Sequence, residues 1–157
     1  KQMAVMTPEL QEKAKALSPE IKGFLGKVAV KHTRHSERAT MVQVMHELLA
    51  DYQAMAAGIA VDNAEMTAEA ARRLAHHRLP RGGLLPYMSL EKVNSKDLAV
   101  LPGMEATVEG GAMEVAEAAE KGDMATAAEK MGKVMGGCVA CHQMFRGTPG
   151  VSPRVRQ

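Results

Sequence analysis

The chain has 157 residues, enough for one domain with its own hydrophobic core. Aromatic residues make up only 3% of the chain, whereas methionine occurs 13 times. Because sheets favour β-branched and aromatic side chains and helices favour Ala, Met, Glu and Lys, this composition disfavours a β-sandwich or β-barrel. The formal net charge of +2 is too small to indicate a nucleic-acid-binding protein, and no apolar stretch is long enough for a membrane span.

Two helix starts lie close to the N-terminus. Thr7 and Ser18 are each followed by proline, which combines an N-cap residue with the residue preferred at the first helical position. We expect short helices over 7–17 and 18–30, followed by a basic connector. Residues 1–35 are therefore interpreted as an N-terminal helical extension.

Four longer segments have helical periodicity or helix-start signals. In the first, apolar residues recur at three- and four-residue spacing between Met41 and Ile59. Pro102 and Asp123 are start signals for the last two. We expect an all-α, antiparallel four-helix bundle over 36–147, with helices over 36–60, 67–77, 102–122 and 123–146, a long loop over 79–101 with one helical turn near 95–98, and a tail over 148–157.

Both cysteines of the chain belong to one motif, Cys138-Val139-Ala140-Cys141-His142, near the end of the last helix. Covalent attachment of a c-type haem uses this spacing, because two thiols bond the porphyrin and the adjacent histidine binds its iron. On a helix the three side chains occupy positions i, i+3 and i+4 and share one side. The motif predicts one haem c bound through Cys138 and Cys141, with His142 as the proximal ligand.

Two other interpretations of the motif are a zinc site and a redox-active dithiol. A structural zinc site needs four ligands, and the sequence has no second cluster with suitable spacing. A redox dithiol is expected at a helix N-terminus, where the helix dipole lowers the thiol pKa, whereas these cysteines lie in the last two turns. A helical thiol-disulfide protein is the alternative from another functional class.

The C-terminal helix resembles the closing helix of the cytochrome c′ family. Members of that family carry the haem motif in the fourth helix of a bundle and follow it with an aromatic and a basic residue, as Phe145 and Arg146 do here. The turn at 118–123 is also similar to the turn before the family's fourth helix. The resemblance covers 36–147 and implies that Phe145 lies against the haem and that Arg146 pairs with a haem propionate.

The first long helix carries the weaker part of the resemblance. Arg38 is similar to the family's propionate-binding arginine, and Val42 and Met45 are similar to the apolar residues on the open face of the haem. Because Val42 cannot coordinate iron, we expect five-coordinate iron that binds NO or CO, transfers one electron, or both. The alternative is a six-coordinate, low-spin electron-transfer cytochrome with Met41, Met45 or His46 as the sixth ligand.

Four other histidines are not expected to bind iron. His32 and His35 lie in the connector, whereas His76 and His77 lie at a helix end, where we expect them to interact with terminal carbonyl groups or solvent.

The sequence also carries expectations about partners and location. The chain begins at Lys1 rather than Met, and we expect a mature periplasmic protein whose signal peptide has been removed. The expected partners are a redox protein and a second copy of the chain, because most cytochromes c′ pair through their first two helices. We find no nucleophile–base pair, paired carboxylates or phosphate loop, and so expect an electron carrier or gas-binding protein rather than an enzyme. Weak peroxidase activity is left open through His46.

Overall fold

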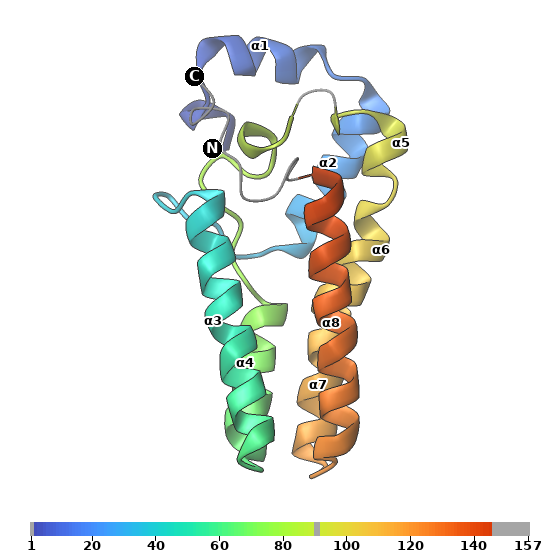
Figure 1. Ribbon diagram of the computed structural model, residues 1–157. Coiled ribbons are helices and arrows are strands. Elements are labelled where there is room, and N and C mark those ends of the chain that lie inside the picture. The colour runs from blue at the N-terminus through green and yellow to red at the C-terminus, as the bar shows by residue number, and fades with distance from the viewer. Residues whose placement is uncertain (1, 90–91, 146–157) are drawn as a thin grey trace, which may run out of the picture.

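The computed structural model describes residues 2–89 and 92–145, and its regular elements are helices (Figure 1). Within those residues β pairing is limited to one isolated parallel bridge between His35 and Leu79. The all-α prediction is confirmed. The elements are η1 (Gln2–Val5), α1 (Pro8–Ala16), α2 (Pro19–Lys31), α3 (Met41–Ala60), α4 (Ala64–Ala75), η2 (Leu85–Tyr87), α5 (Ser95–Leu98), α6 (Leu101–Glu105), η4 (Ala106–Gly110), α7 (Gly111–Glu120) and α8 (Met124–Phe145).

The two helices of the N-terminal extension begin where their capping residues predict. The Thr7 hydroxyl accepts a hydrogen bond from the Leu10 amide at 3.4 Å, and the Ser18 hydroxyl accepts one from the Ile21 amide at 3.3 Å. Each bond satisfies an amide of the first turn that has no partner within the helix. The 3₁₀ turn η1 has no counterpart among the predicted elements.

The first long helix begins five residues later than predicted. Thr40 caps α3 through a reciprocal capping box with Gln43, whose side chain accepts a hydrogen bond from the Thr40 amide at 2.8 Å. The Ser36 hydroxyl instead accepts from the amides of Arg38 and Ala39 in a turn before the helix. The prediction that Arg38 belongs to this helix is therefore wrong.

The third predicted helix, 102–122, is one helical run with an irregular centre. α6 and α7 are joined by η4, a single π-helical segment at Ala106–Gly110. A π segment adds a residue to a turn and so changes the direction in which nearby side chains point. Glu109 lies in this segment.

Four helices pack through small side chains. α3 contacts α4, α4 contacts α7, α7 contacts α8, and α3 also meets α8. Nine of the thirteen residues in the buried cluster between them are alanine, which lets the helix axes approach closely. The remaining buried members are Met55, Leu74, Val115 and Val134.

A second apolar cluster lies between the N-terminal helices and the long loop. It combines Ala14 of α1 and Val28 of α2 with Leu98 of α5 and Leu101 of α6, and Phe145 at the end of α8 packs against it. The extension is thus part of the packed protein; in the view of Figure 1, α1 lies above the long helices and α2 extends down to the height of the upper part of α8.

Candidate functional site

The cysteine motif lies in the last two turns of α8, between the two apolar clusters. Cys138 packs against the first cluster, and Phe145 packs against the second. Both cysteines are free thiols, and Cys138, Cys141 and His142 are all half-buried. The helix therefore presents two thiols and an imidazole along one face at the junction of two apolar regions.

Burial raises the pKa of both thiols. For Cys141, the charge of Cys138 raises the pKa further. Both groups are therefore neutral thiols at pH 7, whereas a redox-active dithiol needs at least one thiol with a lowered pKa.

A glycine next to the motif brings α8 close to η4. A Cβ on Gly137 would lie 2.8 Å from Val108 Cγ2 and 3.0 Å from Thr107 Cγ2, closer than van der Waals contact allows. Gly136 has no such neighbour within 4 Å. The close approach of α8 to η4 therefore requires glycine at position 137 but not at position 136.

The structure brings only some of the predicted residues of the first helix toward the interior. Met41 and Met45 are half-buried, whereas His46 is exposed and Val42 is 64% exposed. Arg38 is exposed in the turn before α3 and lines a shallow surface pocket with Gln43, Glu47 and Arg78. Arg146 and the predicted tail lie outside the described residues.

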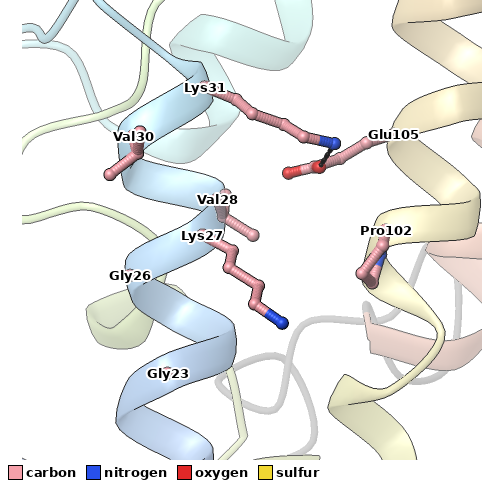
Figure 2. Close-up of a pocket in the computed structure, with 8 residues that line it drawn as sticks. All are labelled: Gly23, Gly26, Lys27, Val28, Val30, Lys31, Pro102 and Glu105. Atoms are coloured by element: carbon pink, nitrogen blue, oxygen red, sulfur yellow. Dashed lines mark hydrogen bonds and ion pairs between the residues drawn. The ribbon is translucent and has the colours of Figure 1, made fainter.

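A groove on the surface separates α2 from α6 (Figure 2). Its walls include Gly23, Gly26 and Val28 on one side and Pro102 on the other. An ion pair at 2.9 Å between Lys31 and Glu105 crosses it at one end.

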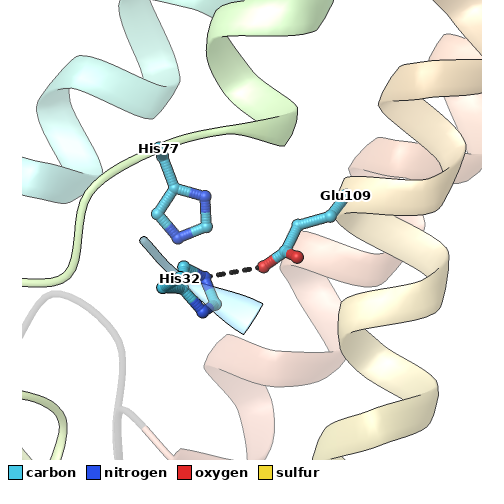
Figure 3. Close-up of side chains that lie close together, drawn as sticks. All are labelled: His32, His77 and Glu109. Carbon is cyan, nitrogen blue, oxygen red and sulfur yellow. Dashed lines mark ion pairs between the residues drawn. The ribbon is translucent and has the colours of Figure 1, made fainter. Parts of the chain in front are cut away.

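Two histidines and a glutamate converge where the end of α2 meets the end of α4 and the π segment. One ligand atom from each of His32, His77 and Glu109 lies within 4.8 Å of the others (Figure 3). The two rings are edge to face, with centroids 4.7 Å apart. His32 Nε2 lies 2.9 Å from Glu109 Oε1, and the His32 side chain is only 5% exposed.

Backbone pairing places these residues together. The connector after α2 runs alongside the segment after α4, where the Ser36 amide bonds the Leu79 carbonyl and the Leu79 amide bonds the Arg34 carbonyl, both at 2.9 Å. The Arg34 guanidinium also donates to the His76 carbonyl at the end of α4. These bonds fix His32 and His77 next to each other although they are distant in sequence.

The environment shifts the pKa of the two rings in opposite directions. Burial alone would lower the pKa of His32, but Glu109, the Val28 carbonyl and Glu105 together raise it. Burial and the neighbouring His32 lower the pKa of His77. The paired rings therefore have different proton affinities.

Sequence reasoning predicted the contacts of His76 and His77 with terminal carbonyls, which are confirmed at 2.9 Å to Arg72 and 3.1 Å to Leu74. It missed the cluster of His32, His77 and Glu109. No local spacing connects these three residues, because each lies at the end or in the irregular turn of a different helix.

Comparison with family models, curated proteins and solved structures found no significant match to this chain. Among the described residues, no helix combines the length and hydrophobicity needed to cross a membrane.

Proposed function

We propose that this chain is a c-type cytochrome of the cytochrome c′ type, with one haem bonded to Cys138 and Cys141 and with His142 as the proximal ligand. The observation that carries the proposal is the placement of these residues on one half-buried face of α8 between two apolar clusters. When bound, the haem supplies one-electron redox chemistry and an iron coordination position for a small ligand. We further propose that the neighbouring contacts of α3, α4, α7 and α8 represent an antiparallel four-helix bundle around it.

The residues present fit such a group. The thiols are free to form thioether bonds, and Cys138 packs against an apolar cluster, surroundings that suit a porphyrin. The many Met and Ala side chains are flexible or small, and so adapt to a rigid flat group. The raised pKa values of the two thiols argue against the alternative of a thiol-disulfide protein.

The orientation of α3 favours a methionine ligand over an open iron site. Val42, on which the five-coordinate interpretation depends, is 64% exposed, and His46 is exposed as well. Met41 and Met45 are half-buried on the side of α3 that is turned toward the rest of the protein. We therefore propose electron transfer with Met41 or Met45 as the sixth ligand, and keep binding of NO or CO as the second candidate.

The exposed apolar residues of α3 support the proposed homodimer. Val42 and Leu49 lie seven residues apart on α3 and are 64% and 48% exposed, so they share one outward face. A dimer through α3 and α4 would cover them. Size-exclusion chromatography with light scattering should give a dimer that Leu49→Lys converts to a monomer; a monomeric parent chain would contradict this part of the proposal.

The decisive experiment is expression of the full chain in a host that attaches c-type haem. We expect a Soret band that stays with the polypeptide on a denaturing gel, and its loss in the Cys138→Ala/Cys141→Ala double variant. His142→Ala should change the ligation spectrum, whereas His76→Ala, which alters an exposed histidine, should not. Absence of the Soret band in the parent chain would refute the proposal.

The spin state of the ferric iron, compared between the parent and single variants, identifies the sixth ligand. We expect a low-spin ferric spectrum that becomes high-spin in either Met41→Ala or Met45→Ala and is unchanged in His46→Ala. A high-spin parent protein that binds CO after reduction would establish the gas-binding candidate instead. The protein is expected to be periplasmic and to exchange electrons with a partner protein.

A further inference from the structure

We propose that His32, His77 and Glu109 form a binding site for a divalent transition-metal cation, separate from the cysteine motif. Two imidazoles and one carboxylate are a ligand set that suits Zn²⁺ and its neighbours in the first transition row. The site does not depend on the proposed haem, because none of its three residues belongs to the cysteine motif or to α3.

The backbone determines which ring nitrogens are available. His32 Nδ1 lies 2.8 Å from the Val28 carbonyl, and His77 Nδ1 lies 3.1 Å from the Leu74 carbonyl. Because a carbonyl oxygen only accepts, each Nδ1 must carry the proton, and each neutral ring then has a bare Nε2. Metal-binding histidines are usually oriented in this way, with the second nitrogen donating to a carbonyl or carboxylate.

His32 Nε2 and a carboxylate oxygen of Glu109 face each other in a buried position. His32 Nε2 lies 2.9 Å from Glu109 Oε1, yet it has no aligned hydrogen-bond partner among the described residues. A proton on Nε2 makes this contact an ion pair, and the raised pKa of His32 favours that proton as long as no metal is bound. A metal cation bonded to both atoms takes the place of that proton and satisfies the buried nitrogen.

The spacing is suitable for a cation after a small adjustment. Metal bonds of about 2.0–2.1 Å to nitrogen allow ligand atoms to lie at most roughly 4.2 Å apart. The three ligand atoms lie within 4.8 Å of each other, so a small side-chain rotation of His77 or Glu109 closes the site. Three protein ligands leave at least one position for water or another small ligand.

The surrounding charge also favours a cation. Glu105, one turn before Glu109, is 11% exposed, and one of its carboxylate oxygens has no hydrogen-bond partner among the described residues. Among the described residues, Lys31 is the lysine or arginine that pairs with it, so the two carboxylates carry one more negative charge than this lysine offsets. The groove of Figure 2 is lined by Glu105 and by Val28, whose carbonyl contacts His32 Nδ1.

The test is calorimetric titration of the full, tag-free chain with Zn²⁺, with its haem if that is present. We expect one site. Each of His32→Ala, His77→Ala and Glu109→Gln should lower the affinity for Zn²⁺ by at least about 100-fold, because loss of a residue that only hydrogen-bonds a metal ligand already lowers metal affinity by about 10–100-fold. His76→Ala and Glu114→Gln change an adjacent exposed histidine and an exposed glutamate, and should bind Zn²⁺ as the parent does.

Co²⁺ identifies the ligand atoms independently. We expect weak visible bands without the intense thiolate-to-metal absorption that binding at Cys138 or Cys141 would produce. Glu109→Gln, which preserves shape, decides the result if a histidine variant does not fold. The proposal is overturned if the parent chain binds no Zn²⁺, if Glu109→Gln binds it unchanged, or if the Co²⁺ spectrum shows thiolate ligation.

Discussion

The phenolic hydroxyl of Tyr52 on α3 donates a hydrogen bond to the backbone carbonyl of Met131 on α8, at 3.2 Å. Met131 lies two helical turns before Cys138, and burial together with the charge of Cys138 raises the pKa of Tyr52. One tyrosine therefore links the helix with the candidate sixth ligands to the helix with the cysteine motif.

Removal of this hydroxyl tests the link. We expect Tyr52→Phe to lower the free energy of unfolding by about 1 kcal/mol, the typical net value of one intramolecular hydrogen bond. Urea denaturation measures the change. Tyr87→Phe is the matched control: Tyr87 bonds the Arg81 carbonyl from an exposed position where water can replace it, so its effect should be smaller. Equal stability of parent and Tyr52→Phe would contradict the prediction.

Adjacent glycines of α8 should respond in opposite ways to alanine. Gly137→Ala places a methyl group against the β-branched side chains of Thr107 and Val108, and we expect a destabilisation of about 1–3 kcal/mol. Gly136→Ala meets no atom within 4 Å and should stabilise the helix by up to about 1 kcal/mol. Thermal unfolding of both variants measures the difference, and an equal shift in both would show that α8 does not approach η4 closely.

The turns after α3 and α7 each contain one residue with a left-handed backbone conformation, but the residue type differs. Asp62 has φ +54° and Gly122 has φ +76°, and each precedes the N-cap of the next helix. We expect Asp62→Gly to stabilise the protein by about 1 kcal/mol, because glycine adopts this conformation without strain. Gly122→Ala should destabilise it by about 1–2 kcal/mol. Chemical denaturation of the two variants checks both signs.

Asp123 should make a pH-dependent contribution to stability. Hydrogen bonds from the Thr126 backbone and side chain lower the pKa of its carboxyl group in the folded protein. A lowered pKa means that the stabilisation is present above the unfolded value of about 3.9 and is lost as the pH falls through the folded value. The melting temperature of Asp123→Ala should therefore lie below that of the parent at pH 7 and approach it in acid.

Asn63 provides the control for this pH dependence. It caps α4 in the same way, through a 3.0 Å bond from the Met66 amide to its side-chain oxygen, but it does not titrate. The decrease in melting temperature caused by Asn63→Ala should be the same at pH 7 and in acid. A pH-independent effect at Asp123 would show that its capping bond does not require the charged form.

The helices were predicted well where the signal was local. Ser18 and Asp123 cap the helices that they were expected to cap, because an N-cap acts on amides within three residues. Asn63 starts α4 at Ala64, before the predicted start at 67, and the capping box at Thr40 competed successfully with the turn at Ser36. Both errors arose where two residues that can cap a helix lie four positions apart along the chain.

The sequence by itself determined the helical class, the helix starts at strong caps and the spacing of Cys138, Cys141 and His142, because all of these depend on residues within about four positions of each other. Only the tertiary structure decided which side of α3 is buried, and only it brought His32, His77 and Glu109 together. Those relationships depend on how the connector pairs with the segment after α4 and on the π turn at 106–110. Such contacts join residues from separate elements, for which the chain carries no periodic or short-range pattern.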